Sequence, residues 1–154
     1  MKQILQSSLV LAVAGHAAAG EISLEACPAA VRETVRRHER QGRVDEVKSY
    51  DIQGNALYVV EIDLPTKREL KLHISSDGTL VKMSEEIPLA ELPEGVRAVV
   101  EQKSAGGTLD DVEKVTEGKV VSYRVEIERR QLPDVDLLLD AAGAILSEKE
   151  EADD

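Results

Sequence analysis

The sequence predicts an α+β fold in which a helix packed on a four-stranded antiparallel sheet occurs twice in tandem. Three observations predict it. The chain matches itself at a constant offset of 65, with sixteen identities between residues 24–86 and 89–151. Each copy opens with apolar residues at helical spacing, and each continues with residues that alternate between apolar and charged.

The predicted helices follow Pro28 and Pro93. Val31 and Val35 in the first copy recur as Val96 and Val100 in the second, four residues apart and therefore on one helix face. Proline is favoured near the first helical turn. Glycines at 42 and 107 are expected to end the two helices.

Extended segments follow each helix, and the tyrosine-led segments at 58–62 and 123–127 are the central pair. Alternation places one set of side chains toward the helices. This predicted core set is Tyr58, Val60, Ile62, Leu72, Ile74, Tyr123, Val125, Ile127, Leu137 and Leu139. Gly78 and Gly143 provide the left-handed conformation for the closing hairpin of each copy.

These segments divide the chain into four parts. Residues 1–19 read as a signal peptide, because Lys2 precedes a short apolar run and Ala17 and Ala19 form a small-x-small cleavage site. The two copies occupy 20–87 and 88–147, and 148–154 is expected to be an acidic, disordered tail. The apolar run is too short to span a membrane, so a periplasmic or secreted location is predicted.

Composition restricts the function classes. Thirty acidic residues against nineteen basic ones give a net charge of −11, which argues against a nucleic-acid partner. The chain has no Phe or Trp, so its core must be aliphatic, and Cys27 is its only cysteine, which excludes an intramolecular disulfide.

No catalytic, cofactor or metal site is predicted. The three histidines have no counterpart in the other copy, because His38 aligns with Lys103 and His73 with Leu138, while His16 lies in the signal. The loops around Asp77 and Asp140 lack the alternating oxygen ligands of a calcium loop. The chain is therefore predicted not to be an enzyme.

Three motifs resemble the PepSY-like, or beta-lactamase-inhibitor-like, domain family of exported bacterial proteins. They are Leu-x-x-x-Pro-x-x-Val before each helix, Tyr-x-Val-Glu-Ile in each central strand, and the closing hairpins at 72–80 and 137–145. The resemblance implies a periplasmic binding or inhibitory module whose two units present a concave sheet, as in the beta-lactamase inhibitory protein. The present chain lacks the paired cysteines and interface aromatics of that inhibitor, which argues against a beta-lactamase target.

The expected partner surface is the sheet face turned away from the helices, which would be mainly negative if the two sheets joined. Its predicted residues are Glu61, Asp63, Lys71, His73, Arg124, Glu126, Glu128, Asp136 and Leu138. The function expected of it is binding of an exported protein partner, or inhibition of a peptidase or other hydrolase. The alternative is a periplasmic sensor of envelope stress, a small ligand or a cation.

Overall fold

The structure is a computed structural model that describes residues 20–151. The predicted signal peptide, residues 1–19, lies outside the described residues. Two α-helices, α1 (Ala29–His38) and α2 (Glu94–Ser104), accompany a sheet whose strands follow one another in chain order. The nine strands are β1 (Gly20–Glu21), β2 (Arg43–Ile52), β3 (Asn55–Asp63), β4 (Glu69–Ser75), β5 (Leu80–Glu86), β6 (Thr108–Glu117), β7 (Val120–Glu128), β8 (Asp134–Asp140) and β9 (Ile145–Glu151).

The predicted fold, a tandem repeat of a helix packed on a four-stranded antiparallel sheet, is wrong, because the strands form a single nine-stranded antiparallel sheet. β5 pairs with β6 from Met83 opposite Thr116 to Glu86 opposite Glu113. An unpaired strand edge exposes backbone donors and acceptors, and this pairing satisfies them on both strands. β1, which the sequence did not predict, pairs with β2. Alternation in a sequence reveals which face a side chain occupies but not which edges join.

Both helices begin where they were predicted. Pro28 and Pro93 are the N-cap residues of α1 and α2, and the four valines that follow are fully buried. Each helix ends before the expected glycine, at His38 and at Ser104. Gly42 has a different role, since a Cβ there would lie 2.7 Å from the carbonyl oxygen of Asp63.

Each helix covers its own aliphatic core, and the predicted alternation of the strands is confirmed. Under α1 lie Val60, Ile62, Leu72 and Ile74, and under α2 lie Val125, Ile127, Leu137 and Leu139, all of them fully buried. Tyr123 is buried in the second core, whereas Tyr58 is half-buried against the first.

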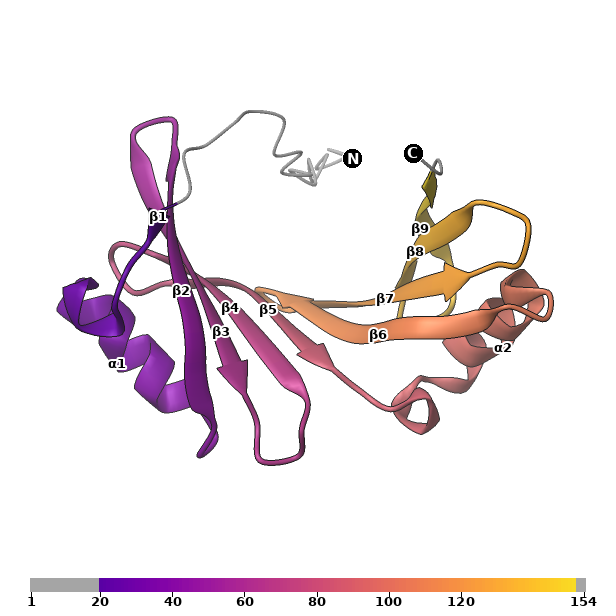
Figure 1. Ribbon diagram of the computed structural model, residues 1–154, viewed down its shortest axis with the longest axis horizontal. Helices are drawn as coiled ribbons and strands as arrows, with labels where there is room; N and C mark the ends of the chain where they lie inside the picture. The colour runs from indigo at the N-terminus through magenta and orange to yellow at the C-terminus, as the bar shows by residue number, and fades with distance from the viewer. Residues whose placement is uncertain (1–19, 152–154) are drawn as a thin grey trace, which may run out of the picture.

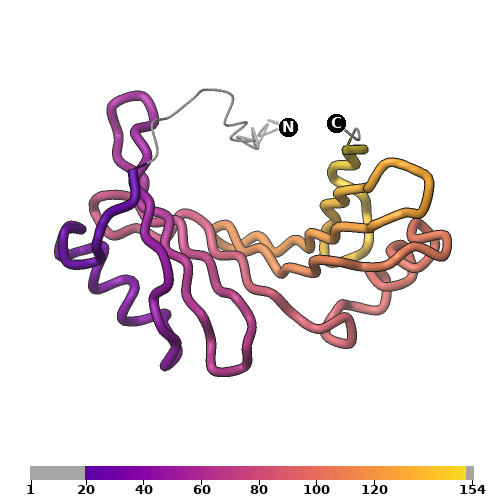
Figure 2. The backbone as a smooth tube through the Cα atoms, viewed as in Figure 1, coloured from indigo at the N-terminus to yellow at the C-terminus, as the bar shows by residue number. Residues whose placement is uncertain are grey.

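The sheet curves between its two ends, with α1 and α2 on the outer side of the curve (Figures 1 and 2). The other face is concave, and neither helix covers it. β9 closes the far end and includes residues 148–151, which were expected to belong to a disordered tail. These residues pair with β8, from Glu148 opposite Leu137 to Glu151 opposite Asp134. The last three residues of the expected tail lie outside the described part of the chain.

Candidate functional site

A groove of about 450 Å³ crosses the concave face from β4 to β9. Its floor lies at the junction of β5 and β6, where Ser84 and Val115 are cross-strand neighbours. Both side chains are buried, at 7% and 3% exposed, although no helix covers this face. The groove therefore exists only because β5 and β6 join into one sheet.

Five of the nine predicted partner residues line the groove: Lys71, His73, Arg124, Asp136 and Leu138. The other four lie outside it. Glu61 pairs with Lys71 on β4, and Asp63 is exposed and pairs with Arg43. Glu126 and Glu128 lie on β7, where Glu126 is half-buried and Glu128 is exposed.

The remaining lining residues were not predicted from the sequence. They are Lys82, Ser84, Glu113, Val115, Glu117, Ser122, Ser147 and Lys149. On β6 these residues recur at every second position, 113, 115 and 117, so the alternation that revealed the core could have found them. The alternation does not reveal the β5–β6 pairing that brings these residues together.

The groove is not mainly negative, in contrast to the expectation for this face. Four cationic side chains line it, from Lys71, Lys82, Arg124 and Lys149, against three carboxylates, from Glu113, Glu117 and Asp136. With His73 neutral, the lining carries a formal charge of +1, whereas the whole chain carries −11. The centre of the concave face is thus a local exception to the acidic surface.

Ion pairs occupy some of these charges and leave others available. Arg124 forms a bidentate pair with Asp136, with Nε 2.9 Å from Oδ1 and Nη2 3.0 Å from Oδ2. Lys71 Nζ lies 3.0 Å from a carboxylate oxygen of Glu61 and 3.3 Å from one of Glu69. Within residues 20–151, neither Lys82 nor Lys149 forms an ion pair.

Two titratable groups show how the groove affects charge. Burial lowers the pKa of His73 to about 4, and the neighbouring cations of Lys82 and Lys71 lower it further. Burial raises the pKa of Glu113, although Arg124, Lys71 and Lys82 act in the opposite direction. The groove therefore partly desolvates His73 and Glu113, and the potential around His73 is positive.

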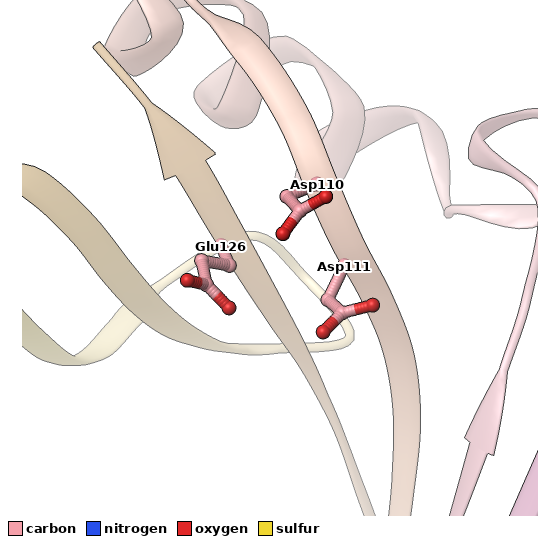
Figure 3. Close-up of side chains that lie close together, drawn as sticks. All are labelled: Asp110, Asp111 and Glu126. Atoms are coloured by element: carbon pink, nitrogen blue, oxygen red, sulfur yellow. The ribbon is translucent and has the colours of Figure 1, made fainter.

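A separate group of three carboxylates lies near the α2 end of the sheet, on Asp110, Asp111 and Glu126 (Figure 3). One ligand oxygen from each lies within 4.8 Å of the others. The β6 register shifts between Leu109 and Val112, so two residues of β6 oppose Glu126 alone. Asp110 and Asp111 are exposed and Glu126 is half-buried, and exposed acidic groups are common without an ion, so we assign no metal site to them.

None of the helices formed by residues 20–151 is both long enough and apolar enough to cross a membrane.

Comparison with known proteins gives structural relatives only. No family model matches the sequence, and no curated protein matches it. Among solved structures, a BLIP-like protein from Bacteroides fragilis is 19% identical, with a TM-score of 0.60 over 82% of this chain and 90% of that one. A DUF2874 family protein from Bacteroides uniformis is 18% identical, with a TM-score of 0.65 over 80% of this chain and 89% of that one.

A third structure, described as a candidate periplasmic protein from Bacteroides eggerthii, is 12% identical, with a TM-score of 0.67. It covers 80% of this chain and 88% of its own. At these identities the likeness establishes the fold, which the chain shares with a BLIP-like protein and with DUF2874 family proteins. The predicted periplasmic or secreted location agrees with the description of the third structure.

Proposed function

We propose that this chain is an exported, non-enzymatic binding module that receives a protein partner on the concave face of its sheet. The observation that carries the proposal is the uncovered groove of about 450 Å³, whose floor is buried without help from either helix. A face with a formed groove and a buried floor is suited to a protruding segment of another molecule.

The finer form of this proposal is inhibition of an exported peptidase or other hydrolase. Support comes from the fold, which a BLIP-like protein shares. Interface hot spots are enriched in Trp, Tyr and Arg, and this face has few side chains of these types. Arg124 lines the groove, and Tyr50 lies on the same face of β2 as Lys48. Those two side chains are the anchors that such an inhibitor would use.

The charges of the groove favour binding over catalysis. A general base works best when its pKa lies near the operating pH, and His73 has a pKa of about 4. Arg124 and Lys71 are engaged in ion pairs with Asp136 and Glu61. These groups are therefore held in fixed charge states that suit recognition.

The second candidate is a periplasmic sensor of a small ligand. The size of the groove favours it, because small-molecule sites commonly measure about 300–1,000 Å³. The two candidates differ in what the purified protein retains. A sensor would carry a small adduct when isolated from the exported fraction, and native mass spectrometry would detect it.

The test is to fill the groove and follow the partner. Leu138→Trp with Ser147→Trp would place two bulky, uncharged side chains on neighbouring lining positions. Ala98→Trp with Gln102→Trp adds the same bulk on exposed positions of α2 and serves as the matched control. We expect the groove variant to lose a partner retained from the exported fraction and the helix variant to keep it. Equal retention by both folded variants would contradict the proposal.

A further inference from the structure

Building on the proposed function, we propose that the groove receives an extended acidic segment of the partner and that one of its carboxylates binds the ammonium group of Lys82. This gives the partner a defined chemistry. An acidic chain of net charge −11 would ordinarily be expected to favour a basic partner. The groove reverses that expectation locally, because its lining carries one more cation than carboxylate.

Lys82 is the cation best placed to receive a carboxylate. It is half-buried on β5, directly opposite His73 on β4, and it forms no ion pair within the described part of the chain. An ammonium group has three donors and no acceptor. The neighbouring Lys71 is already paired with Glu61 and Glu69, and Arg124 with Asp136.

The surroundings of Lys82 strengthen an ion pair formed there. The burial that lowers the pKa of His73 shows that water is partly excluded from this end of the groove. Ion pairs gain strength as the effective dielectric falls. Ser84 places a hydroxyl group in the same lining, which offers a carboxylate a further donor.

The shape of the groove favours a peptide segment over a single small anion. The lining extends from β4 to β9, and five strand spacings correspond to about 24 Å. An extended peptide covers this distance with about seven residues. Lys82 lies toward one end and Lys149 on β9 lies at the other, so the segment would carry an acidic residue near each end.

His73 provides a local readout of occupancy. We would titrate histidine-labelled protein by NMR with the acetylated and amidated heptapeptide Glu-Ser-Gly-Ser-Gly-Ser-Glu, at millimolar concentration and constant ionic strength. A bound carboxylate opposes the field of Lys82 and Lys71, so the pKa of His73 should rise from about 4 by more than about half a unit. The NMR signals of His38, on α1, should be unaffected by the peptide.

Two variants and two further probes complete the experiment. Lys82→Gln should weaken peptide binding about threefold to fivefold. Lys114→Gln removes the same charge from an exposed position on the opposite face of β6, and it should leave binding unchanged. The same peptide with Gln in place of both Glu residues should not shift His73. Inorganic phosphate at matched ionic strength should shift it less than the Glu peptide does.

The inference is overturned if the Glu and Gln peptides act alike, if Lys114→Gln weakens binding as much as Lys82→Gln, or if phosphate alone reproduces the full shift. Its failure is distinguishable from failure of the proposed function. If filling the groove abolishes partner binding but the peptide does not bind, only the proposal of an acidic segment is rejected. Peptide binding, together with a partner that is unaffected by filling the groove, supports an acidic-peptide site in the groove and rejects the proposed protein partner of this face.

Discussion

The concave face contains two β-bulges of the same kind that differ in charge balance. In the α1 half, the register of β2 shifts between Val44 and Glu46, opposite Glu61. In the α2 half, the register of β6 shifts between Leu109 and Val112, opposite Glu126. Both bulges gather acidic side chains around a glutamate of the central strand.

Lysines balance the first bulge. Lys48 pairs with Glu46, and Lys71 pairs with Glu61 at 3.0 Å. At the offset of 65 the corresponding residues are Glu113 and Asp136, so the second bulge has neither lysine. Burial raises the pKa of Glu126, and the nearby Glu151, Asp111 and Asp110 raise it further. The buried pattern is shared by the two halves, whereas the charges of the open face differ between them.

The largest expected effect tests what the halves share. Ile62 pairs with Val44 and Ile127 with Leu109, each beside its bulge and each fully buried. Ile62→Ala and Ile127→Ala should each lower the free energy of unfolding by about 2–5 kcal/mol, measured by urea denaturation. Leu138→Ala, on the open face, should cost less than about 1 kcal/mol. Costs below about 1 kcal/mol for both isoleucines would reject the shared core.

A second shared feature is the turn that packs against each helix. Gly78 and Gly143 have φ values of 87° and 93°. A Cβ would lie 2.7 Å from the Ala30 carbonyl oxygen in the first turn and 2.5 Å from that of Gly95 in the second. Gly78→Ala and Gly143→Ala should each destabilise the protein by more than about 1 kcal/mol, measured by thermal and urea unfolding. A neutral result at either turn would show that its helix can shift away.

The third prediction concerns the pH dependence of stability, which should differ between the halves because His73 of the α1 half corresponds to Leu138 in the α2 half. The pKa of His73 falls from 6.5 to about 4 on folding. Its contribution to stability is therefore present above pH 6.5 and is lost as the pH falls toward 4. Between pH 7 and pH 4.5 the parent should lose about 1 kcal/mol more than His73→Gln, after allowance for solvent screening.

Urea denaturation of both proteins at the two pH values measures this difference. The contributions of the other titrating groups are common to both proteins and cancel. His73 faces Lys71 on its own strand and Lys82 on β5. Identical losses in parent and variant would mean that His73 is solvated in the folded protein.

The helices, the core and the closing turns could be predicted because each depends on residues that are close together in the sequence. The spacing of Val31 and Val35 predicts a helix face, and the alternation of Val60 and Ile62 predicts a strand face. The joining of β5 to β6 depends on contacts between residues about thirty positions apart, as for Met83 and Thr116. No periodicity encodes that pairing, and the groove and the position of Lys82 were missed with it.

The smallest expected effect tests directly the difference in charge balance between the two bulges. Like charges on neighbouring strands destabilise a sheet by about 0.2–1 kcal/mol, and opposite charges stabilise it by a similar amount. Glu126→Gln should therefore raise the free energy of unfolding by that amount at pH 7, whereas Glu61→Gln, which removes the partner of Lys71, should lower it.

The raised pKa of Glu126 also fixes the direction of the pH dependence. Ionising Glu126 is harder in the folded protein than in the unfolded one, so its unfavourable contribution appears as the pH rises through the acid range. The advantage of Glu126→Gln should vanish below the unfolded pKa of glutamate, and it should shrink in 1 M NaCl as the charges are screened. If Glu126→Gln and Glu61→Gln both lowered the free energy of unfolding at pH 7, the two bulges would not differ in charge balance, and Glu126 would have a compensating partner.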